Sequence, residues 1–158
     1  MNPLTITIPG VPPSVNLGRS QHWSKVAGST EQFRSLASVC TKNAVMEWGE
    51  PLLPWVGGRP LRLVVWHYPD TLRGDAHNRE KAVVDGIVDG LNNAMEYRGE
   101  HSPKLFNDSH IAICSMHPVR DKENPRVVCR LVPEDWFAFC FGRTRCYWRS
   151  KKETPAAE

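Results

Sequence analysis

The sequence has few of the features that mark membrane, secreted or zinc-finger proteins. None of its apolar runs approaches the roughly 20 residues that a membrane helix needs. Its first residues show neither the basic nor the apolar part of a signal peptide, so we expect a cytoplasmic protein without membrane contact. Its five cysteines include no CxxC pair. This argues against a disulfide framework or a structural zinc site and predicts buried free thiols.

The chain also lacks a strong excess of either charge, and a net charge of +3 does not by itself indicate nucleic-acid binding. Residues 136–152, however, hold five basic residues, six aromatic residues and no acid. These aromatics either stack on unpaired bases or cap the core or a dimer interface, and both interpretations stay open. We predict a single domain over residues 1–133 and an aromatic, basic extension over residues 134–158, with a disordered end at 153–158.

Hydrophobic periodicity predicts four strands and two helices in the order β-α-β-α-β-β. This order favours a compact α/β (α+β) sandwich, in which a small mixed sheet carries both helices on one face and the last two strands pair as a hairpin. Leu17–Gly28 shows no periodicity and is expected to be a mobile loop. The expected strands are Leu4–Ile8, Leu61–Tyr68, Ser109–Val119 and Arg126–Val132, and the expected helices are Ser29–Trp48 and Asn78–Met95.

Both predicted helices carry start or stop signals and an apolar stripe. Ser29 and Gln32 have the spacing of a capping box, Gly49 can stop the first helix, and Asn78 is placed to cap the second. The predicted buried stripes are Phe33, Leu36, Ala37, Cys40, Ala44 and Trp48 on the first helix, and Val84, Ile87, Val88, Leu91 and Met95 on the second.

The polar residues with the clearest chemical pattern lie between the second strand and the second helix. Asp75 and His77 are two residues apart in an extended turn, so both side chains can point toward one ion. On the helix, Asn78, Lys81 and Asp85 are three and four residues apart and share one face. Taken alone, such a face is typical of solvated surface, with Lys81 and Asp85 as an ordinary ion pair.

A further acid, Asp108, directly precedes the third predicted strand. A sheet can gather carboxylates at strand ends into a site for a hard cation such as Mg²⁺. In phosphodiester hydrolysis, such an ion polarises the phosphoryl oxygen, helps to deprotonate water and stabilises the leaving oxygen. A nearby lysine, here Lys81, neutralises transition-state charge or orients the water. We therefore predict a metal site formed by Asp75, His77 and Asp108.

Taken in order, these motifs resemble those of the RusA-type Holliday-junction endonucleases. The pattern is Pro-Pro-Ser-x-Asn at 12–16, Asp-x-x-Asn-x-x-Lys-x-x-x-Asp at 75–85 and Asn-Asp-x-x-Ile at 107–111. The resemblance covers residues 6–132, and its most specific part is 73–87.

The resemblance implies a homodimeric, Mg²⁺-dependent enzyme that nicks two strands symmetrically across a four-way DNA junction. It also implies a bacterial or phage origin and no small-molecule cofactor. By the same resemblance, Asp75 and Asp108 are catalytic aspartates, Lys81 is an essential lysine and Asp85 is a further acid on the helix.

Two features depart from the family pattern. His77 stands where the family carries a third aspartate, and its neutral imidazole favours a single ion, or Mn²⁺ in place of Mg²⁺. The connection from Asp85 to Asp108 is also long, with residues 97–104 as the apparent insertion. The alternatives to Asp108 are Glu96 and Glu100.

A junction-binding protein needs cationic side chains for the DNA phosphates, and its affinity falls as salt rises. We expect one such surface in the early loop and around Asp75, and a second in the C-terminal extension. The predicted DNA-binding residues are Arg19, Lys25, Arg73, Arg79, Arg143 and Arg145.

Two other functions remain open on the sequence alone. A protein that lost catalysis through His77 would bind branched DNA without cleaving it. A metal-independent RNase or a zinc protein would instead use the scattered histidines His77, His101, His110 and His117.

Overall fold

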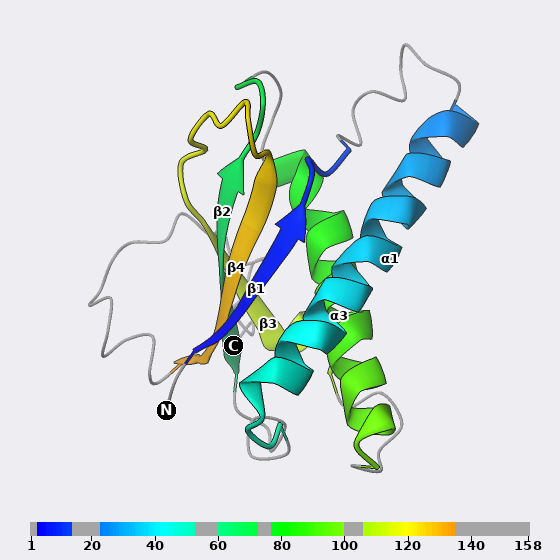
Figure 1. The fold of residues 1–158 in the computed structure, drawn as a ribbon, viewed down its shortest axis with the longest axis vertical. Helices are drawn as coiled ribbons and strands as arrows, with labels where there is room; N and C mark the ends of the chain where they lie inside the picture. Colours follow the sequence, from blue (N-terminus) through cyan, green and yellow to red (C-terminus); the bar gives the residue numbers. More distant parts are fainter. Residues whose placement is uncertain (1–2, 14–22, 53–59, 73–76, 100–105, 135–158) are drawn as a thin grey trace, which may run out of the picture.

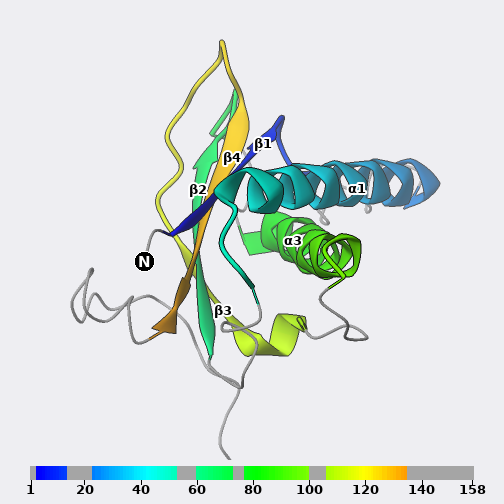
Figure 2. The same cartoon turned by 60° about the horizontal axis from the view of Figure 1, so that its bottom comes forward.

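A computed structural model describes residues 3–13, 23–52, 60–72, 77–99 and 106–134 of the chain. The fold is the predicted α+β arrangement, a mixed four-stranded sheet with two helices packed on one face (Figures 1 and 2). Its elements are β1 (Leu4–Pro9), α1 (Trp23–Trp48), β2 (Leu61–Tyr68), α3 (His77–Tyr97), a 3₁₀ turn (Asp108–His110), β3 (Ile111–Ser115) and β4 (Arg126–Pro133).

The strands are ordered β1-β4-β2-β3, so the predicted hairpin of the last two strands is wrong. Strand β3 is parallel to β2, whereas β4 lies between β1 and β2 and is antiparallel to both. The chain after β3 stays beside β2, because Met116 N donates to Val65 O at 2.9 Å and Val119 N donates to His67 O at 3.0 Å. The chain therefore runs past the end of β2 before it reverses direction. Strand β4 then pairs with β2 on the side opposite to β3.

The predicted third strand is also too long at both ends. Residues 108–110 form the 3₁₀ turn, and the strand ends at Ser115. Beyond it, the Asp121 carboxylate accepts a hydrogen bond from Arg126 Nη1 at 2.6 Å, which joins the connection to the start of β4.

The core lies between the sheet and the two helices. In β1, Leu4, Ile6 and Ile8 are fully buried and alternate with exposed residues, as expected for a strand that packs on one side. On α3, Ile87, Leu91 and the other predicted stripe residues are buried, except Val88, which is half-buried.

Helix α1 is longer than predicted. It begins at Trp23, so the expected loop is wrong for residues 23–28, and the Ser29–Gln32 pair lies inside the helix. No proline occurs in this stretch, and a helix propagates easily once formed. Leu36, predicted to be buried, is 38% exposed, and Val45 is buried instead. Gly49 follows the helix with a φ of 72°, which confirms the stop signal.

Helix α3 begins one residue before its predicted start. Asn78 therefore lies in the first helical turn instead of preceding it. Two glycines of α3 then allow a close approach to α1. A Cβ atom at Gly86 would lie 2.5 Å from Ala37 Cβ, and one at Gly90 would lie 2.5 Å from both Ser38 O and Thr41 Cβ. Because they are four residues apart, the glycines share one face of the helix.

The described cysteines agree with the expectation that the chain has no disulfide framework. Cys114 and Cys129 are buried, Cys40 is half-buried, and none of these three forms a disulfide. Within the described ranges, no helix is both long and apolar enough to span a membrane.

Candidate functional site

An open groove of about 1290 Å³ lies on the outer side of the two helices, between α1, α3 and residues 106–108. Three predicted catalytic residues line it, namely Lys81, Asp85 and Asp108. Lys81 and Asp108 are exposed, and Asp85 is half-buried. Lys81 and Asp85 reach the groove together because they are one helical turn apart. The groove thus brings a lysine and two carboxylates to one surface.

Asp108 is held near α3 by Asn92. The Asn92 side chain donates to Phe106 O at 3.1 Å and accepts from Phe106 N at 3.0 Å. The Phe106 side chain is buried, and Asn107 Oδ1 accepts from Ser109 N at 3.2 Å at the start of the 3₁₀ turn. Asn92 is thus a positioning residue for Asp108. Sequence reasoning missed it, because no local pattern distinguishes it from other polar residues of the helix.

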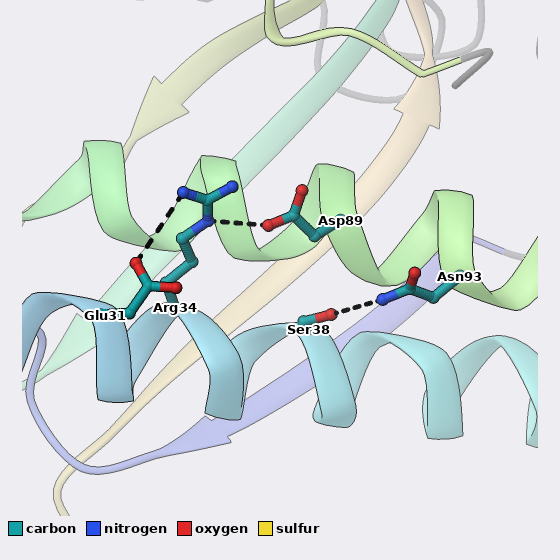
Figure 3. Close-up of polar contacts among 5 residues, drawn as sticks. All are labelled: Glu31, Arg34, Ser38, Asp89 and Asn93. Carbon is teal, nitrogen blue, oxygen red and sulfur yellow. Dashed lines mark hydrogen bonds and ion pairs between the residues drawn. The ribbon is translucent and has the colours of Figure 1, made fainter. Parts of the chain in front are cut away.

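The two helices also contact each other across the groove (Figure 3). Arg34 Nε donates to Asp89 Oδ2 at 2.7 Å, and Glu31 Oε2 lies 3.9 Å from the same guanidinium. The hydrogen bond to Asp89 raises the pKa of Arg34. Asn93 Nδ2 donates to Ser38 Oγ at 3.2 Å. These partly exposed contacts join the two walls of the groove.

Among the described residues that line the groove, acidic side chains outnumber basic ones. Two of these residues, Arg34 and Lys81, are cationic, and five are carboxylates. A phosphate group would meet net repulsion there unless further positive charge were bound. The five carboxylates are those of Glu31, Asp85, Asp89, Glu96 and Asp108.

The candidate residues are spread along the groove. Glu80, in the first turn of α3, hydrogen-bonds to Ser115 at the end of β3, whereas Asp108 precedes the beginning of that strand. Asn92, which holds the Asp108 segment, follows Lys81 by eleven residues, or about 16 Å at 1.5 Å per residue. Asp108 therefore lies toward the opposite end of the groove from Lys81.

Most of the other predicted site residues lie outside the described part of the chain. Lys25 belongs to α1, His77 is the first residue of α3 and His110 ends the 3₁₀ turn, but their side chains are not described. Arg79 is half-buried in the first turn of α3, and His117 is exposed after β3. The predicted residues wholly outside the described ranges are Arg19, Arg73, Asp75, Glu100, His101, Arg143 and Arg145.

The predicted metal set of Asp75, His77 and Asp108 therefore stays a prediction. Among the described side chains, no three His, Cys, Asp or Glu residues lie together in a way that could hold a metal ion. Asp85 and Asp108 supply carboxylate oxygens of the kind that Mg²⁺ prefers. A metal centre in the groove would complete this pair with a ligand from beyond the described side chains.

Comparison with known proteins does not add a family. No model of a known protein family matches the chain, and no curated protein matches it. The likeness to RusA-type endonucleases accordingly remains a hypothesis based on the motifs.

Proposed function

We propose that this chain is a metal-dependent endonuclease that resolves four-way DNA junctions as a homodimer, in the cytoplasm of a bacterium or of a phage-infected cell. The observation that supports it best is the groove shared by Lys81, Asp85 and Asp108. These residues come from two of the three motifs that resemble the RusA-type pattern. The fold thus places residues 27 positions apart in the chain on one surface.

Each residue has a defined role in this proposal. Asp75, His77 and Asp108 are the proposed ligands of Mg²⁺ or Mn²⁺, and Asp85 is a further acid on α3. The bound ion supplies the activation of water and the polarisation of the phosphoryl group. Lys81 carries the positive charge that stabilises the transferring phosphoryl group. The acidic character of the groove fits this scheme, because bound divalent cations would offset its repulsion of phosphate.

Cleavage of a synthetic four-way junction tests the proposal. The intact chain is expected to cut two strands symmetrically with Mg²⁺ or Mn²⁺, and sedimentation should show a dimer. Asp75→Asn and Lys81→Ala should each reduce the cleavage rate by about 10²–10³-fold, the usual effect of removing a preorganised electrostatic contact. Junction binding should remain in both variants.

Asp89→Asn is the matched control. Asp89 lies on the same helix and in the same groove, but it pairs with Arg34 and has no role in the proposed chemistry. Its variant should cleave at close to the rate of the unmodified chain. If Asp75→Asn and Asp89→Asn lower the cleavage rate equally, the amide substitutions act through protein stability or overall charge. That result would refute the assigned roles.

The alternative function is binding of branched DNA without cleavage. The distance along α3 between Lys81 and the Asp108 segment favours it, because a compact metal site needs its ligands close together. Tight junction binding without cleavage in either metal would support this alternative. Asp108→Asn would then leave binding unchanged.

A further inference from the structure

The face of the sheet that α1 and α3 leave uncovered carries a second apolar cluster. Val64, Cys114 and Val132 are 2%, 8% and 1% exposed, and they are separate from the core on the helix side. Neighbouring residues such as Leu63 and Leu131 point to the helices, because side chains alternate along a strand. Figure 2 shows both helices on that one side. Three side chains on this face, called the helix-free face below, are thus buried although neither α1 nor α3 lies above them.

Burial this complete requires a cover from another part of the chain. The described apolar side chain that packs against this cluster from outside is Trp66, and it is itself only partly buried. At the exposed end of the same face, Arg130 lies over the Trp66 ring at 5.5 Å from its centroid. The outer residues of β1, Thr5 and Thr7, are exposed. The cover therefore lies over one end of the face, where Val64 and Val132 sit.

Glu134, the residue that follows β4, lies at the same end of the sheet and on the same face as Val64 and Val132. Glu134 is two residues beyond Val132, and its carboxylate binds the Arg62 guanidinium, with Arg62 Nε donating to Glu134 Oε2 at 2.6 Å. Arg62 precedes Val64 by two residues and therefore shares its side of the sheet. Glu134 N also donates to Pro60 O at 3.0 Å. These contacts hold the outgoing chain beside the buried cluster.

The geometry points to the next six residues, Trp136–Phe141, as the segment that packs on the helix-free face and covers the cluster. Four of these six residues are aromatic. Such a run buries its apolar surface in a protein that functions in water. It begins two residues after Glu134, within direct reach of Val132. The aromatic residues of this segment then belong to the domain and not to a separate extension.

Native cysteines on the two faces test this assignment in the full-length chain. Cys114 belongs to the helix-free cluster, and Cys129 is fully buried in the helix-side core. Alkylation under native conditions, followed by peptide mass spectrometry, measures both thiols in one sample. A double variant with Trp136→Ala and Phe139→Ala should raise the alkylation rate of Cys114 at least tenfold and leave that of Cys129 unchanged.

Two control variants identify the covering segment. Trp148→Ala removes an aromatic residue outside Trp136–Phe141 and should leave Cys114 protected. Trp55→Ala changes the segment before β2, a second stretch that could reach this end of the sheet. Loss of Cys114 protection in Trp55→Ala but not in the double variant would overturn the proposal.

Cross-linking keeps the proposal testable if the double variant unfolds and both thiols react. Arg130→Cys places a thiol at an exposed position of the helix-free face, directly opposite Val64 in the strand register. Val39→Cys places one at a position of α1 that is 57% exposed. A short bismaleimide should join Cys140 to position 130 at least ten times faster than to position 39. Equal or reversed rates would refute docking on the helix-free face.

Discussion

Substitution of Gly90 by alanine tests the close packing of the two helices. In an open helix, Gly→Ala stabilises by up to about 1 kcal/mol, because alanine has the higher helix propensity. At Gly90 the new Cβ would lie 2.5 Å from the backbone oxygen of Ser38 and from Cβ of Thr41, which is fully buried. Neither atom can move without a shift of α1, and overpacking of this kind costs about 1–3 kcal/mol.

Gly28→Ala is the matched control for this change. Gly28 lies in α1 and is exposed, and a Cβ atom there would meet nothing within 4 Å. The propensity gain is the same in both variants, so their difference isolates the steric cost. In urea unfolding, we expect the free energy of unfolding of Gly90→Ala to be about 1–3 kcal/mol lower than that of Gly28→Ala. Each kcal/mol of this difference should lower the Tm by about 2–4 °C. Equal stabilities would refute the close approach of α1 and α3.

Three further predictions follow from polar contacts. Asn92→Ala should lower junction cleavage without abolishing DNA binding, because it releases the 106–108 segment, and hydrogen exchange should show that segment opening. The pKa of Asp121 is lowered by its arginine partner, so its ionised form stabilises the fold above about pH 4 and this contribution disappears as pH falls further. The difference in the free energy of unfolding between the unmodified chain and Asp121→Asn should therefore disappear in acid. A double-mutant cycle on Arg34 and Asp89, both about 40% exposed, should give a coupling below about 1 kcal/mol.

Local patterns were sufficient to predict the order of the four strands and the two long helices, although not all of their ends. The alternation of Leu4, Ile6 and Ile8 identifies a strand with one buried side, and the stripe of Ile87 and Leu91 identifies an amphipathic helix. Gly49 marks the end of α1 because a residue with positive φ is usually glycine. The early start of α1 was missed, because its first turns have no apolar periodicity and no capping signal at Trp23.

The arrangement of those elements depends on contacts that no local pattern records. The side of β2 on which β4 pairs is set by the path of residues 116–121. Within the candidate site, the spacing of Lys81 and Asp85 predicted their shared surface. The contact of Asn92 with Phe106 spans 14 residues and that of Arg34 with Asp89 spans 55, so both required the fold. The position of Asp108 relative to Lys81 likewise follows from the contact of Asn92 with Phe106.

The sheet order also governs how the protein is made. Among the described strands, β1 pairs only with β4, and Leu4 pairs with Leu131, 127 residues later in the chain. At a synthesis rate of about 5–20 residues per second, β1 emerges from the ribosome roughly 6 to 25 s before its partner exists. The apolar side of β1 packs on α1, which is synthesised soon after it, but the backbone groups of β1 that pair with β4 have no strand partner until β4 arrives. The edge of the sheet that is made first is therefore the one that pairs last.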